Sequence, residues 1–135
     1  MSARLLSVLR IVAAFLFIAH GTQKLLGFPG DTEHVTYLSL YGLAGVIESV
    51  GGTFILLGLF TRPVAFLAAG EMAVAYFLMH FPKGLWPLLN HGELAVLYCF
   101  LFLYIGVAGP GPWSLDRIRQ ERADIRTTGA RRFKS

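Results

Sequence analysis

Hydrophobic residues gather in long runs that are separated by short polar or glycine- and proline-rich segments. The runs cover about residues 5–27, 39–60, 63–81 and 90–109. A bilayer core of about 30 Å takes roughly 20 helical residues to span, and each run approaches that length. We therefore predict an all-α fold of four transmembrane helices. The short connections favour an antiparallel four-helix bundle.

Breaking residues mark the ends of these runs. The sequences GFPG, TRP, PKGLWP and GPGP interrupt the apolar pattern. Thr61 is predicted to cap the third helix, and Ser114 a last short helix. The first run also resembles a secretory signal, because Arg4 and Arg10 precede an apolar middle. No small-residue cleavage pattern follows it, so a retained membrane helix is the preferred interpretation.

Charge divides the chain into a neutral membrane domain, residues 1–115, and a basic tail, residues 116–135. The tail has seven basic and three acidic residues and so carries the whole net charge of +4. Only 15% of the chain is charged, against roughly 25% in soluble domains. Beside so much hydrophobic sequence, a basic tail indicates the cytoplasmic membrane face and not nucleic acid. We predict that both termini are cytoplasmic and that the tail is partly helical or disordered.

The second run carries one carboxylate, Glu48, near its middle. Such a group costs about 3 kcal/mol or more at that depth, so it should face the protein interior or a wet pocket. Small residues flank it at spacings of three and four: Gly42, Gly45, Ser49 and Gly52. This stripe predicts close approach by a neighbouring helix.

The other runs also carry titratable side chains. His20 and Lys24 share a face of the first run, and the third run contains Glu71. His91 and Glu93 begin the fourth. The topology puts Glu48 and Glu71 near the midplane and the rest toward the outer end. We therefore predict a polar pocket that opens outward, with a purely structural polar network as the alternative.

Three carboxylates face one ammonium in this predicted pocket. By depth, Lys24 should pair with Glu93. At least one of Glu48 and Glu71 should then take and release a proton, which makes them the candidate catalytic residues. His20, Lys24, His91 and Glu93 are the candidate ligand-binding residues. We predict no metal site, because the Glu-x-x-His pattern of di-iron bundles is absent, and the single cysteine excludes a two-cysteine redox pair.

With these residues in view, the chain resembles the DoxX family of small bacterial membrane proteins. The resemblance covers about residues 5–118. It is carried by the Glu48 and Glu71 helices and by HGTQKLLGF, LGLFTRPVA, NHGELAVLY and GPGPWSLD. It implies a multi-pass protein of the bacterial inner membrane, in a family whose relatives include subunits linked to quinone reduction. A quinone is thus a candidate ligand, although no catalytic role is carried over.

We expect a redox-associated membrane subunit whose pocket binds quinone or a small polar ligand. The electron donor would be a protein partner on the cytoplasmic tail or the outer face. The alternatives are a non-enzymatic scaffold or binding protein and a small proton-coupled transporter, which would need to form a homo-oligomer.

Overall fold

The computed structural model describes residues 2–30 and 37–132, so the first loop and the end of the tail lie partly outside the described residues. The described residues are helical and contain no strand, which confirms the all-α class. Two stretches are π-helical (η1, η2) and one is a 3-10 turn (η3). The elements are α1 (Ala3–Leu26), α2 (Leu40–Val46), η1 (Ile47–Gly51), α3 (Gly52–Leu57), α4 (Thr61–Ala75), η2 (Tyr76–His80), η3 (Phe81–Lys83), α5 (Pro87–Asn90), α6 (Glu93–Ala108) and α7 (Leu115–Arg132).

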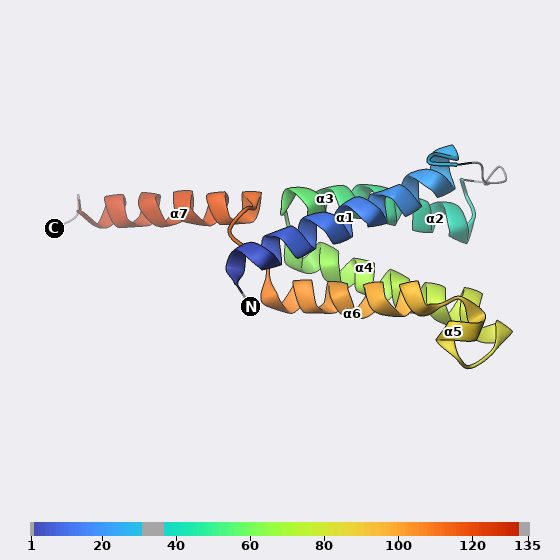
Figure 1. The fold of residues 1–135 in the computed structure, drawn as a ribbon. Coiled ribbons are helices and arrows are strands. Elements are labelled where there is room, and N and C mark those ends of the chain that lie inside the picture. Colours follow the sequence, from blue (N-terminus) through green and yellow to red (C-terminus); the bar gives the residue numbers. More distant parts are fainter. Residues whose placement is uncertain (1, 31–36, 133–135) are drawn as a thin grey trace.

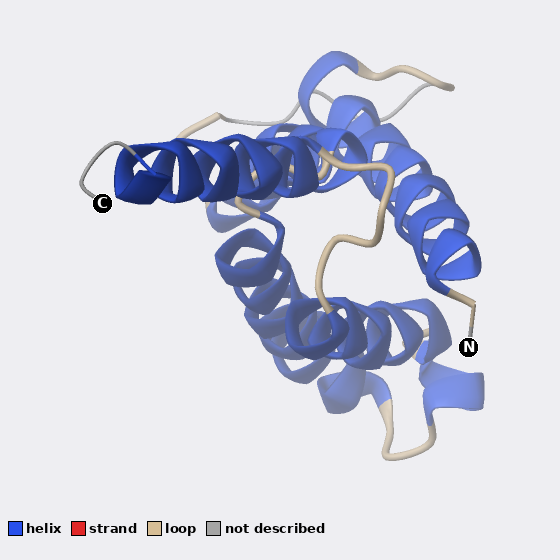
Figure 2. Cartoon of the chain, turned by 90° about the vertical axis from the view of Figure 1, so that its left-hand side faces the viewer, coloured by secondary structure: helices blue, strands red, loops and turns tan. Residues whose placement is uncertain are grey.

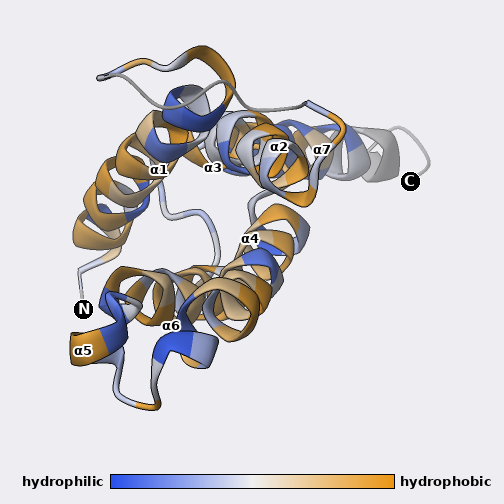
Figure 3. Ribbon diagram, turned by 90° about the vertical axis from the view of Figure 1, so that its right-hand side faces the viewer, coloured by the Kyte–Doolittle hydropathy of each residue, from blue (hydrophilic) through white to orange (hydrophobic). Residues whose placement is uncertain are grey.

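Three described helical stretches are long and apolar enough to cross a bilayer. They are α1, the continuous segment Leu40–Leu57, and Thr61–Lys83. Hydrophobic residues predominate along these helices (Figure 3), and many of the large ones are exposed, as expected for surfaces that contact lipid. The fourth predicted span, α6, has 16 residues and is about 24 Å long, which is shorter than the hydrocarbon core. A fourth crossing therefore stays a prediction.

The helices associate as two pairs, α1 with α2–α3 and α4 with α6 (Figure 1). Glycines bring the first pair together. A Cβ on Gly21 of α1 would lie only 2.4 Å from the Ser49 hydroxyl, and one on Gly52 would lie 2.7 Å from the Ile18 side chain. The predicted small-residue stripe is confirmed at these positions, because only glycine permits so close an approach.

An aromatic cluster joins the two pairs in the core. Phe17 of α1 packs edge-on against Phe102 of α6, with ring centroids 4.7 Å apart. Tyr98 stacks on Phe102 at 5.6 Å. These rings are buried with alanines and Met72 of α4. The buried rings therefore form the contact between α1 and α6.

Arg10 closes the end of the bundle nearest α7. The side chain is fully buried, and its guanidinium donates to the main-chain carbonyls of four residues. These acceptors are Pro110, Ile55, Leu56 and Trp113, so they belong to α3 and to the connection between α6 and α7. The guanidinium thus supplies hydrogen-bond donors to backbone carbonyls at the end of α3 and in the α6–α7 connection.

Two further charged side chains complete this junction. The carboxylate of Asp116 accepts hydrogen bonds from the amides of Phe60 and Thr61, at 2.9 and 2.8 Å. Arg62 donates to the Val107 carbonyl at 2.6 Å, at the end of α6. Asp116 therefore supplies the cap of α4, and the prediction of Thr61 as the cap is wrong, because Thr61 is the first helical residue.

Beyond this junction α7 projects away from the bundle as a single helix (Figures 1 and 2). The Ser114 hydroxyl accepts the Arg117 amide at 3.2 Å, which confirms the predicted cap. The tail is helical throughout the part that the structure describes, up to Arg132. From Leu115 to Gly129 every side chain except that of Asp116 is exposed.

Candidate functional site

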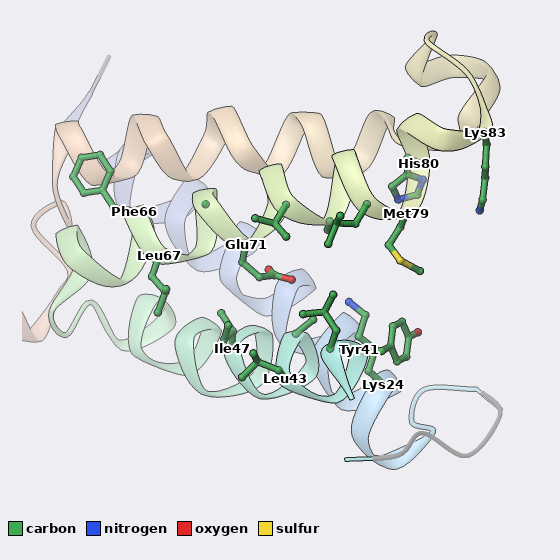
Figure 4. A pocket seen from close by; sticks show the side chains of 16 residues that line it. Lys24, Tyr41, Leu43, Ile47, Phe66, Leu67, Glu71, Met79, His80 and Lys83 are labelled. Atoms are coloured by element: carbon green, nitrogen blue, oxygen red, sulfur yellow. The ribbon is translucent and has the colours of Figure 1, made fainter. Parts of the chain in front are cut away.

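A pocket of about 700 Å³ lies between the α2–η1 segment and the α4–η2 segment (Figure 4). Most of its lining is aliphatic, from residues such as Leu43, Ile47, Leu67 and Val74. Several of these side chains are about half exposed, so the pocket opens sideways, toward the side that lipid would occupy. Its polar lining residues are Lys24, Tyr41, Glu71, His80 and Lys83.

Lys24 forms an ion pair with Glu48 behind this pocket. The ammonium of Lys24 donates to the Glu48 carboxylate, and the Glu48 side chain is 2% exposed. The predicted pairing of Lys24 with Glu93 is wrong. Gly45 of α2 lies against the Lys24 and Leu25 side chains, and this close approach of α1 and α2 brings Glu48 within reach of Lys24. Glu93 belongs to the other helix pair.

Glu71 of α4 is the second carboxylate of the site, and it points from α4 into the pocket (Figure 4). It lies close enough to Glu48 and Lys24 to interact with both charges. Both of its carboxylate oxygens are buried, and neither has a hydrogen-bond partner among the described residues. Buried polar groups are rarely left in this state, so Glu71 marks a place where a ligand would complete the structure.

Both walls of the pocket contain a π-helical turn. Glu48 lies in the turn Ile47–Gly51, and the turn Tyr76–His80 forms one end of the opposite wall. Such turns are rare inside α-helices and are frequent at functional sites. Their presence on both sides supports a binding role for the space between them.

Hydrogen bonds around Asn90 fix the outer end of the α4–α6 pair. The buried Asn90 amide donates to the Gly84 carbonyl at 2.7 Å, and its side-chain oxygen accepts the Gly92 amide at 2.8 Å. The ring nitrogen of His80 lies 3.1 Å from the Asn90 carbonyl. His80, which lines the pocket, is therefore held by the backbone of α5.

The predicted site residues do not all meet. Lys24, Glu48 and Glu71 come together, as described above. His20 is half-buried beside them on α1, with its ring edge-on to Tyr98 at 6.1 Å. His91 and Glu93 are exposed at the start of α6 and do not line the pocket. The fourth run thus contributes no titratable side chain to the pocket in the described structure.

Sequence reasoning missed two features of this site. Tyr41 lines the pocket with its ring 5.3 Å from the Lys24 ammonium, a cation–π contact. Lys83, the last residue of η3, lines the end of the pocket next to His80. Tyr41 lies near the start of the Glu48 run, 17 residues from Lys24, and a tyrosine at that position gives no separate signal for such a contact. Lys83 could have been found because the predicted topology puts it in an outer loop, where a basic residue is unusual.

At the centre of the arrangement, Lys24 and two carboxylates lie beside an apolar space, and Lys83 lines its far end. Glu48 neutralises Lys24, and Glu71 is left as an acceptor that faces the pocket. Within residues 2–30 and 37–132, no group of three His, Cys, Asp or Glu side chains is placed to hold a metal ion. What the site offers is therefore hydrogen bonding and proton exchange with an apolar molecule that carries a polar head.

Comparison with known proteins gives family and membrane location. The DoxX family matches residues 5–81 of the chain. An uncharacterized protein of Haemophilus influenzae is 49% identical over 82% of the chain and 87% of its own length. The Escherichia coli inner membrane protein YqjF is 32% identical, over 85% of the chain and 92% of its own length. The Mycobacterium tuberculosis membrane protein Rv3486 is also 32% identical, over 85% and 81% respectively. No solved structure matches the chain.

Proposed function

The chain belongs to the DoxX family of membrane proteins, and from this premise we propose that it is an inner-membrane subunit that binds a quinone for a redox partner. The observation that carries this proposal is Glu71, whose buried carboxylate lacks a hydrogen-bond partner in the described structure and faces an apolar pocket. A quinone has an apolar tail for the leucine-lined space. It also has two head oxygens that need a hydrogen-bond donor when oxidised and an acceptor when reduced.

Two charged side chains of the pocket, Lys24 and Glu71, fit these two needs. The Lys24 ammonium has three donors and uses one on Glu48, so it can donate to a quinone carbonyl. Glu71 can accept from a quinol hydroxyl and take its proton. Reduction consumes two electrons and two protons per quinone. The protein partner supplies the electrons, and Glu71 with Glu48 exchanges the protons.

We propose a membrane arrangement in which α6 is the fourth span and both termini are cytoplasmic. Arg4, Arg62 and the basic α7 belong to one end of the bundle, and the positive-inside rule assigns that end to the cytoplasm. The pocket then opens in the outer half of the bilayer. A short fourth span is compatible with local thinning of the bilayer.

Equilibrium binding of a short-tailed benzoquinone and of its quinol to the protein in lipid nanodiscs tests this proposal. Glu71→Gln should weaken quinol binding by about 10-fold or more, because a hydrogen bond to a charged group is worth about 1.5–3 kcal/mol. Its effect on quinone binding should be smaller. Lys24→Met should weaken quinone binding.

Glu93→Gln is the matched control, since it removes the same charge from an exposed position outside the pocket. It should leave both affinities unchanged. The proposal fails if neither form of the ligand binds, or if Glu93→Gln and Glu71→Gln have equal effects. Mass spectrometry of co-purified lipids would separately identify an ordinary phospholipid in the pocket.

A second candidate is a binding protein without chemistry, and the Lys24–Glu48 pair favours it. An ion pair between α1 and η1 also serves to hold two helices in register. In that case ligand binding would survive, but its affinity would not differ between quinone and quinol.

A further inference from the structure

The helix α7 presents two different faces to its surroundings. At about 100° per residue, one side carries alternating basic and aliphatic side chains, Leu115, Ile118, Arg119, Arg122, Ile125 and Arg126. The opposite side carries Asp116, Arg117, Gln120, Glu121 and Asp124. All the acidic residues of the helix therefore lie away from the face that holds three arginines, which we call the basic face.

The start of α7 contacts the end of the bundle from both sides, through Asp116 and through Arg119 of the basic face. The Arg119 guanidinium lies over the Phe60 ring, 4.9 Å from its centroid. Phe60 and Trp113 are both about half exposed at this end. Aromatic residues of this kind gather where hydrocarbon meets the headgroups. The first turns of α7 thus begin at the level where the lipid headgroups would lie.

We propose that the basic face of α7 binds the headgroups of anionic phospholipids in the leaflet next to this end of the bundle. The headgroup layer adds about 5–8 Å to each side of the hydrocarbon core. Ile118, Arg119 and Arg122 lie in the first two turns, and long arginine side chains extend further toward phosphates. Because α7 projects away from the bundle (Figure 1), it would tilt toward the membrane surface when its aliphatic side chains enter the acyl boundary, as in other interfacial amphipathic helices.

Lipid fits this face better than the other occupants of a basic helix do. A second copy of α7 would need an apolar seam, but Arg122 interrupts the seam between Ile118 and Ile125. The phosphates of a nucleic acid would pair with the arginines but would make no favourable contact with the aliphatic side chains. The carboxylates of Glu121 and Asp124 on the other side of the helix would repel them.

Hydrogen exchange of the α7 amides in the full-length protein tests this proposal. The protein is placed, one copy per disc, in nanodiscs of phosphatidylcholine alone or with phosphatidylglycerol. We expect exchange to be at least 10-fold slower in the anionic discs and to rise again at high salt. Arg122→Gln should speed exchange about fivefold in the anionic discs, which corresponds to about 1 kcal/mol for one arginine.

Arg117→Gln is the control because it removes the same charge from the other face of the same helix. Arg117 is exposed, and its ion pair with Glu121, at 2.9 Å, contributes little. Its exchange rates should stay within twofold of the wild type. The proposal is overturned if protection is equal in both lipids, if Arg117→Gln acts as Arg122→Gln does, or if protection appears only with two copies per disc. It does not depend on the ligand of the pocket, and binding of quinone leaves all three outcomes open.

Discussion

The two ends of the bundle differ in how far their buried charged side chains are hydrogen-bonded. At the α7 end, Arg10 is fully buried and donates to four carbonyls. At the pocket end, Lys24 and Glu48 satisfy each other in part, and Glu71 has no hydrogen-bond partner within the described residues. A buried charge with all its partners fixes a structure, whereas one without them stores a cost that a ligand can remove. The difference supports our proposal that the pocket end is the place of function.

Arg10→Ala should have the largest effect on this comparison. It removes the donor to the carbonyls of Leu56, Pro110 and Trp113, and Ile55 keeps only the Gly58 amide. We therefore expect a loss of about 3–5 kcal/mol in the free energy of unfolding. Unfolding in mixed detergent, followed by circular dichroism, measures it. Arg4→Ala on the exposed side of the same helix should change little. Equal losses in the two variants would contradict a structural role for Arg10.

Lys24→Met should have the next largest effect, because it leaves Glu48 buried and unpaired. We expect a loss of about 3 kcal/mol. The double variant Lys24→Met with Glu48→Leu should recover most of that loss, since a well-packed apolar pair replaces the ion pair. The same unfolding measurement applies to all variants. No recovery in the double variant would show that the pair does more than neutralise its own charges.

Asp116→Asn should cost about 1 kcal/mol at neutral pH, the usual contribution of a helix cap. Burial acts to raise the pKa of Asp116, but the hydrogen bonds from Thr61 and Phe60 and the charge of Arg119 outweigh it and hold the pKa below its ordinary value of 3.8. The ionised carboxylate therefore stabilises the fold above that pH, and its contribution is lost as the pH falls through the lower folded-state value. Unfolding curves of variant and wild type should converge in acid. A constant difference at every pH would contradict this.

Glu71→Gln should have the smallest effect on stability, within about 0.5 kcal/mol, because it breaks no hydrogen bond that the structure shows. Its effect on ligand binding should nevertheless be the largest of the pocket variants. Parallel unfolding and binding measurements separate the two quantities. A large loss of stability would mean that Glu71 has a structural partner, and the contrast between the two ends would then disappear.

Local sequence was informative wherever one residue and its near neighbours decide the outcome. The apolar runs predicted the helices, with ends within a few residues of those observed, and the Ser114 cap needs only the amide three residues later. The glycine stripe predicted a close helix contact, although it could not identify α1 as the partner. The pairing of Lys24 was predicted wrongly because depth in the membrane does not say which helices are neighbours.

The sequence by itself determined the membrane class, the helical segments and which side chains are costly to bury, since these depend on composition and on spacing along one helix. Tertiary structure alone decided which of those side chains are satisfied. The cap of α4 comes from Asp116, 55 residues beyond Thr61. Arg10, which the sequence suggested only as a cytoplasmic anchor, reaches carbonyls up to 103 residues away. Hydrogen bonds between residues so far apart in the sequence form only when the helices pack. No local sequence pattern predicts how the two helix pairs pack against each other.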